Sequence, residues 1–176
     1  MEKIALLRGV TPTGKNRIPS MAHLAQVMED AGFSQVRTYI QSGNLLLSTP
    51  HSDDDTRLLI HKVILETIGA DLSVILKDAD QLARAAKEAP FGPDYDHSRV
   101  HLVFTNDPIP EDKLDQLQNT DFGDELLRVG RECLYCYLPR EAKKKRLNTN
   151  YLEKYLGITA TMRKHSVVSR LVQMAR

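Results

Sequence analysis

The sequence predicts an α+β protein made of two ferredoxin-like halves, each a split β-α-β unit, with additional helices. Two observations predict this fold class. Stretches with strand and helix periodicity alternate in the order β-α-β-β-α-β up to residue 76, and part of that order recurs after a segment rich in Pro and Gly, PFGPDYDHS at 90–98. The predicted domains are therefore residues 1–89 and 98–176.

The first half is predicted from its periodicity and its helix caps. Ser20 is a suitable N-cap for a helix whose apolar residues recur at helical spacing, and Gly32 supplies its end. Ser52, followed by acidic residues, is a suitable start for a second helix. The predicted elements are a strand at 3–8, a helix at 21–31, a hairpin of strands at 36–40 and 45–49, a helix at 52–67 and a strand at 72–76.

A further helix, capped by Asp78 and ended by Pro90, completes the first half. The second half shows weaker but similar signals. Its predicted elements are a strand at 99–105, a helix at 110–118, strands at 125–129 and 132–138, a helix at 147–156 that stops at Gly157, and a last helix with an apolar face between 167 and 175.

The composition is that of an ordinary globular protein. The 176 residues are 41% hydrophobic and 27% charged, and the net charge is +1. No apolar run is long enough for a membrane span, and the N-terminus does not resemble a secretory signal, so we expect no membrane partner and a cytoplasmic location. The low net charge does not indicate nucleic acid as a partner of the whole molecule.

The two cysteines form a C-x-x-C motif, Cys133 to Cys136, on a predicted strand. Three residues along a strand separate the two Cα atoms by about 10 Å and turn the side chains to opposite faces, which a disulfide cannot bridge. The histidines show no zinc-ligand spacing. We therefore expect inert cysteines, no metal and no cofactor.

Residues 9–15, GVTPTGK, fit the frame of a phosphate-binding P-loop. The surrounding residues argue against this function. Asn16 stands where the Ser or Thr for magnesium should be, Pro12 removes a backbone N–H group, and Pro19 would lie inside the helix that Lys15 should begin. The helix is expected to start later, and no reaction is predicted from this loop.

The same loop is a candidate site for a simpler anion. Strands 3–8 and 36–40 run in the same direction in a split β-α-β sheet, so the segments that follow them should leave one edge together. Such an edge suits a small phosphate or carboxylate ligand. The alternative is ordinary turn chemistry with solvated cations. The candidate ligand-binding residues are Arg8, Lys15, Asn16 and Arg17 in the first loop, and Gln41, Ser42 and Asn44 in the turn.

Two other functions stay open. Arg140, the lysines at 143–145 and Arg146 form a basic run, and Tyr135 with Tyr137 could stack bases as in RNA-recognition motifs, which would make the second half a nucleic-acid-binding module. The tyrosine face could equally be buried, and the basic run solvated. A scaffold recognised by another protein is the third possibility.

Four stretches together resemble a known family: ALLRGVTPTGKNRIP, MAHLAQVMEDAGF, VRTYIQSGN and TMRKHSVVSRLVQMA. The family is domain-of-unknown-function family 1697, a group of uncharacterised bacterial proteins. The resemblance implies an α+β fold and no assigned activity. Its members often close with T-x-R-N-W; Thr161 and Arg163 match this pattern, whereas Lys164 and His165 depart from it. Arg163 is therefore added to the candidate ligand-binding residues.

Overall fold

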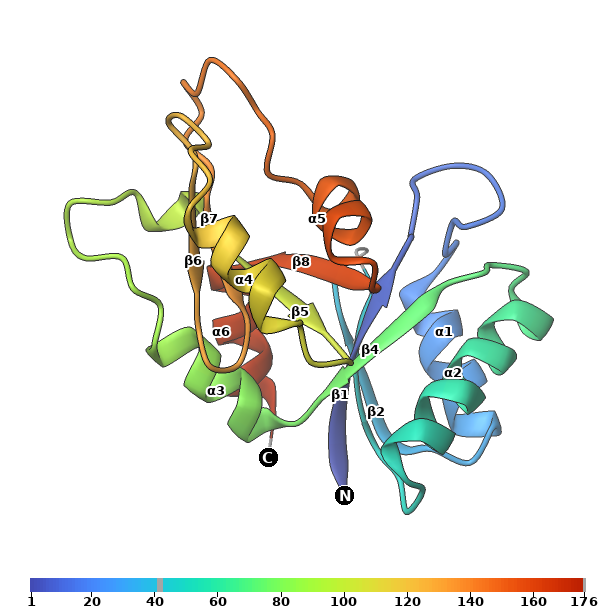
Figure 1. Ribbon diagram of the computed structural model, residues 1–176. Helices are drawn as coiled ribbons and strands as arrows, with labels where there is room; N and C mark the ends of the chain where they lie inside the picture. The colour runs from blue at the N-terminus through green and yellow to red at the C-terminus, as the bar shows by residue number, and fades with distance from the viewer. Residues whose placement is uncertain (41–42, 176) are drawn as a thin grey trace. The chain divides into compact units, whose positions relative to one another are not determined.

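The computed structural model describes residues 1–40 and 43–175. These residues form two compact units, one made of Met1–Ala79 with the last residues from Met174, and the other of Asp80–Gln173. The first unit has the predicted split β-α-β order (Figure 1). Its elements are β1 (Glu2–Arg8), α1 (Met21–Asp30), β2 (Ser34–Tyr39), β3 (Asn44–Ser48), α2 (Asp53–Thr67) and β4 (Ser73–Lys77).

The strands of the first unit lie in the order β2-β3-β1-β4, and neighbouring strands are antiparallel. Both helices cover the same face of this sheet (Figure 1). Alternate residues of the strands, such as Ala5 and Leu45, pack against Leu24 of α1 and Ile60 of α2 in one buried cluster. The apolar residues whose spacing predicted the two helices therefore include residues that form the core.

Two of the predicted helix caps, Ser20 and Ser52, are confirmed. The Ser20 side chain accepts a hydrogen bond from the His23 backbone N–H (3.2 Å), and the Ser52 side chain accepts one from Asp55 N–H (3.2 Å). Each serine satisfies a backbone donor that the first turn of the helix leaves unpaired.

Strand β2 carries a bulge. Its pairing with β3 changes register between Ser34 and Arg37, and Gln35 adopts a positive φ of 52°. The bulged strand lies at one end of the strand order, so it is an edge strand of this sheet.

The second unit repeats the strand order of the first. Its strands are ordered β6-β7-β5-β8, again with antiparallel neighbours, which confirms the second ferredoxin-like half. Its elements are α3 (Ala79–Lys87), a 3₁₀ turn (His97–Arg99), β5 (Val100–Thr105), α4 (Glu111–Gln118), β6 (Leu126–Val129), β7 (Leu134–Tyr137), α5 (Thr149–Leu156), β8 (Ala160–Lys164) and α6 (His165–Met174).

Strand β8 is absent from the sequence prediction. It pairs along β5, with Leu102 opposite Arg163 and Phe104 opposite Thr161, and it completes the split β-α-β order of this half. Its sequence, ATMRK, is short and half polar, and α6 begins at the very next residue without a Gly or Pro between them. The usual signals of a strand and of its end are therefore missing.

Helix α3 lies mostly in the second unit, although the sequence analysis placed it within residues 1–89. Its backbone carbonyls explain the difference. Ala85 accepts a hydrogen bond from the Tyr135 hydroxyl (2.6 Å), and the Ala86 carbonyl lies 2.9 Å from Nε2 of His165. Arg84 also pairs with Glu132 (3.0 Å). The boundary between the units consequently falls near Ala79.

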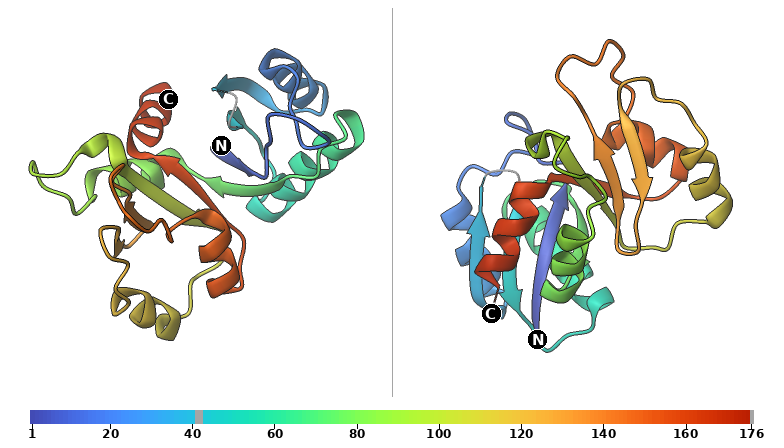
Figure 2. Two further views of the ribbon diagram at one scale, coloured as in Figure 1. Left: turned by 90° about the horizontal axis from the view of Figure 1, so that it is seen from above. Right: turned by 90° about the vertical axis from the view of Figure 1, so that its left-hand side faces the viewer.

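Helices lie on both sides of the second sheet (Figure 2). On one side, Leu117 of α4 and Leu152 of α5 pack with Val103, Leu134 and Cys136 of the strands in a buried cluster. Helix α6 lies on the other side (Figure 2, left). None of the described helices is both long and apolar enough to cross a lipid bilayer.

Candidate anion-binding site

The loop after β1 folds back on itself before α1 begins. Thr11 N–H donates to the Asn16 carbonyl (3.1 Å), and Arg17 N–H donates to the Gly14 carbonyl (3.3 Å), so Lys15 lies in a closed turn. Gly14 has a φ of +83° there, a conformation that favours glycine. Helix α1 begins at Met21, well beyond Lys15. The P-loop geometry, in which the helix starts at the lysine, is therefore not formed.

The described end of the 41–44 turn contacts the base of this loop. Leu7 N–H donates to the Gly43 carbonyl (2.9 Å). A Cβ atom on Gly43 would lie 2.9 Å from Cβ of Leu7, closer than such atoms approach, and 3.0 Å from Cγ2 of Val10, which is tighter than an ordinary contact. The first loop and Gly43 thus lie at the same end of the sheet, where Leu6 of β1 is opposite Asn44 of β3. Gln41 and Ser42, both predicted to orient a ligand, lie outside the described residues.

Two of the predicted ligand-binding residues, Asn16 and Asn44, form hydrogen bonds with the backbone of the protein. Asn16 accepts a hydrogen bond from Asp71 N–H through its side-chain oxygen (3.1 Å), which ties the loop to the start of β4. Asn44 is fully buried, and its amide donates to the Tyr39 carbonyl (2.9 Å) across the turn. Through these two bonds the Asn16 and Asn44 side chains support the loop and the turn.

Lys15 and Arg17 are the exposed cations of the loop, and neither forms an ion pair with any residue that the structure describes. Arg8 is half-buried at the end of β1. Asp71, whose backbone N–H donates to Asn16, has its carboxylate Oδ1 2.8 Å from Nε2 of His61. The loop therefore presents a positive charge that the described residues do not neutralise.

Arg163 lies in β8 of the second unit and is 7% exposed. Its guanidinium donates to the Thr161 hydroxyl (2.6 Å) and to the Met162 carbonyl (3.0 Å). Thr161 and Arg163, the two residues that match the family pattern, are thus hydrogen-bonded to each other. These bonds give Arg163 a defined position within the second unit.

The tyrosine face proposed for base stacking is covered. Tyr135 is 1% exposed, and its hydroxyl is bonded to α3. Tyr137 packs against Phe91 and Tyr95, with ring centroids 5.6 and 5.0 Å away. Because Tyr135 cannot reach a base, the RNA-recognition type of surface is not formed by this pair of residues.

The cysteines are free and buried. Burial raises the pKa of the Cys136 thiol to about 12, with smaller contributions from Glu125 and Cys133. A thiol with such a pKa stays protonated at neutral pH and is a poor nucleophile. Among the residues that the structure describes, His, Cys, Asp and Glu side chains form no group of three that could hold a metal ion.

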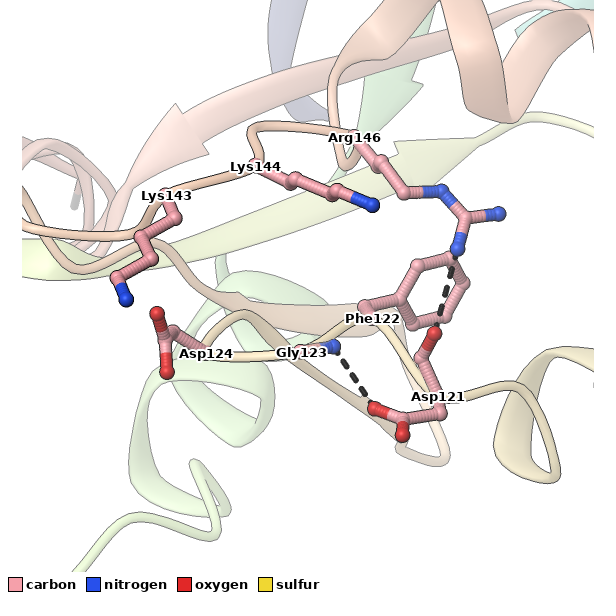
Figure 3. A pocket seen from close by; sticks show the side chains of 7 residues that line it. All are labelled: Asp121, Phe122, Gly123, Asp124, Lys143, Lys144 and Arg146. Atoms are coloured by element: carbon pink, nitrogen blue, oxygen red, sulfur yellow. Dashed lines mark hydrogen bonds between the residues drawn. The ribbon is translucent and has the colours of Figure 1, made fainter.

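A pocket that the sequence analysis missed lies beside the basic run. Its volume is about 360 Å³, and it is lined by Asp121, Phe122, Gly123 and Asp124 on one loop and by Lys143, Lys144 and Arg146 on another (Figure 3). The basic run pointed to only one of these loops. The other, DFGD, has the composition of an ordinary turn, so sequence alone gave no reason to place it opposite the lysines.

Residues 1–135 match the model of a family described as "Protein of unknown function (DUF1697)". The chain belongs to the DUF1697 family. The fold of this DUF1697 protein is similar to a solved structure, that of conserved bacterial protein SP0830 from Streptococcus pneumoniae. The TM-score is 0.74 and the identity 19%, over 99% of this chain and 98% of that chain. A likeness at this identity concerns the fold alone. A search of curated proteins found no match.

Proposed function

We propose that this DUF1697 protein binds a small phosphate-bearing anion, such as a nucleotide, at the edge formed by the first loop and the 41–44 turn. One observation carries the proposal: the loop that holds Lys15 and Arg17 meets Gly43 at its base, through the Leu7–Gly43 hydrogen bond of 2.9 Å. Converging backbone turns with unneutralised cations are the usual elements of an anion site.

The residues have distinct roles in this proposal. Lys15 and Arg17 neutralise the anion, and the arginine can hold two of its oxygens at once. Gln41 and Ser42 supply hydrogen bonds that orient it, and Arg8 adds positive charge at the end of β1. Asn16 and Asn44 act indirectly, since the bonds to Asp71 N–H and to the Tyr39 carbonyl support the loop and the turn.

Ligand-induced stabilisation tests the proposal. A ligand that binds only the folded state raises the unfolding temperature, so inorganic phosphate, pyrophosphate and nucleoside phosphates are titrated into the full chain. The expected result is a rise that Lys15→Glu and Arg17→Glu each abolish. Lys62→Glu, which reverses an exposed charge on α2, is the matched control and should keep the rise. Equal responses of Lys15→Glu and Lys62→Glu would contradict the proposal.

A further inference from the structure

The pocket of the second unit places opposite charges on facing loops. Lys143 extends from one loop toward Asp124 on the other, and Lys144, on the same loop as Lys143, extends toward Arg146 (Figure 3). No ion pair joins these side chains in the described part of the chain. The Asp121 carboxylate already accepts a hydrogen bond from Gly123 N–H (2.8 Å), which leaves Asp124 as the carboxylate without such a bond among the described residues.

A buried carboxylate holds the two loops together. Glu125 is 3% exposed and accepts hydrogen bonds from the backbone N–H groups of Arg146 (2.6 Å) and Leu147 (2.9 Å). It directly follows the Asp121–Asp124 loop, so it ties that loop to the segment carrying the lysines. The pocket is thereby positioned before any ligand arrives, which lowers the entropy cost of binding.

Arg146 adds a flat surface to this pocket. Its guanidinium lies 5.0 Å from the ring centroid of Phe122 and 5.8 Å from that of Tyr151, and it donates to the Asp121 carbonyl (3.2 Å). Phe122 is 4% exposed, whereas Arg146 is exposed. A guanidinium supported in this way offers a plane on which an aromatic base can stack.

We propose that this pocket is a second ligand site, separate from the edge of the first unit, and that it binds a guanine nucleoside monophosphate. Lys143 and Lys144 bind the phosphate, and the base stacks on Arg146. Guanine carries two adjacent N–H donors, at N1 and on the exocyclic amine, which match the two acceptor oxygens of Asp124. A volume of about 360 Å³ lies in the range of small-molecule sites. The carboxylates disfavour a bare polyphosphate.

Calorimetric titration of the full chain with guanosine monophosphate tests the phosphate contact. Lys143→Ala combined with Lys144→Ala is expected to weaken binding about tenfold or more, the loss typical of charge-assisted hydrogen bonds. Lys145→Ala is the matched control, because Lys145 belongs to the same basic run but does not line the pocket. Equal affinities of the double variant and the Lys145→Ala variant would overturn the proposal.

Asp124→Asn tests recognition of the base. Wild-type protein should bind guanosine monophosphate more tightly than adenosine monophosphate, and Asp124→Asn should remove that preference while keeping the phosphate contact. Both comparisons are repeated in the Lys15→Glu background, in which binding at the edge of the first unit is expected to be abolished, so that the titration reports the pocket of the second unit alone. A preference that survives Asp124→Asn overturns the proposal. The proposal is also overturned if the protein binds oligonucleotides but not the monophosphate, and if that binding depends equally on Lys143 and Lys145. Such a result indicates a nucleic-acid surface.

Discussion

Gly43, in the 41–44 turn, packs tightly against Leu7 and Val10, where the first loop begins. Its φ is +83°, and an added Cβ would overlap Leu7 and Val10. Gly43→Ala therefore combines the cost of a left-handed conformation, about 1–2 kcal/mol, with that of overpacking, about 1–3 kcal/mol. Gly69→Ala is the control, because Gly69 has a φ of +86° with nothing within 4 Å.

Urea denaturation should show a larger loss of unfolding free energy for Gly43→Ala than for Gly69→Ala. The difference measures the contact with the loop, since both variants share the backbone cost. Equal losses in the two variants would mean that Leu7 and Val10 move aside without a loss of unfolding free energy. The tight packing around Gly43 would then be contradicted.

Glu125 plays the same supporting role in the second unit. Replacing it with Ala leaves the backbone N–H groups of Arg146 and Leu147 without their acceptor, which should cost about 3 kcal/mol of unfolding free energy. Glu125→Gln keeps one acceptor oxygen and should cost about 1 kcal/mol. Denaturant titration of both variants checks the order. If the Gln variant were as unstable as the Ala variant, the side-chain oxygen at position 125 would not be stabilising the protein as an acceptor for these two N–H groups.

Helix α3 is joined to β7 by the hydrogen bond from the Tyr135 hydroxyl to the Ala85 carbonyl, and we expect this bond to stabilise the helix. Tyr135→Phe removes the hydroxyl that donates to the Ala85 carbonyl, and we expect a loss of about 1–2 kcal/mol because that carbonyl is left without its donor. Hydrogen exchange of the α3 amides should become faster. Tyr137→Phe is the control: the Tyr137 hydroxyl accepts from Asp96 N–H, outside α3, so the exchange of α3 should not change.

The elements also show how far the sequence could predict this molecule. The caps at Ser20 and Ser52 and the order of the first six elements follow from local signals, which depend on neighbouring residues only. The assignment of α3 to a unit does not. Its apolar stripe shows that one face is buried, but which sheet covers that face is decided by distant residues such as Tyr135.

Some features of the two candidate sites could also be predicted from the sequence, whereas others could not. The meeting of the first loop with Gly43 follows from strand directions, so it could be inferred from topology. The engagement of Asn16 with Asp71 and the pocket beside Lys143 could not, because both join segments that no short-range pattern relates. A basic run shows where cations are, and only the fold determines what faces them.

The free energy of unfolding of the whole molecule should depend on pH through His101. Burial lowers the pKa of His101; its bond to the Arg99 carbonyl raises that pKa, and the charges of Arg99 and Lys164 lower it. Between the lowered pKa and the unfolded value of about 6.5, the unfolded state binds more protons. The stability due to neutral His101 is therefore full above about pH 6.5 and falls as the pH decreases below it.

Denaturant titrations between about pH 7.5 and 5 measure this effect, in a range above the ordinary titration of carboxylates. His101→Gln should flatten the decline, while His51→Gln, at an exposed position, should leave it unchanged. A decline of the same steepness in the His101→Gln variant would assign the effect to other groups.

The bulge in β2 also bears on how copies of the molecule behave when concentrated. An outermost strand displays unpaired amides and carbonyls that a second chain can adopt as a template for growing a fibril. The shifted register at Ser34–Arg37, with Gln35 turned to positive φ, breaks the regular spacing of those groups. We therefore expect the irregularity to hinder intermolecular β-sheet growth on this side of the first unit.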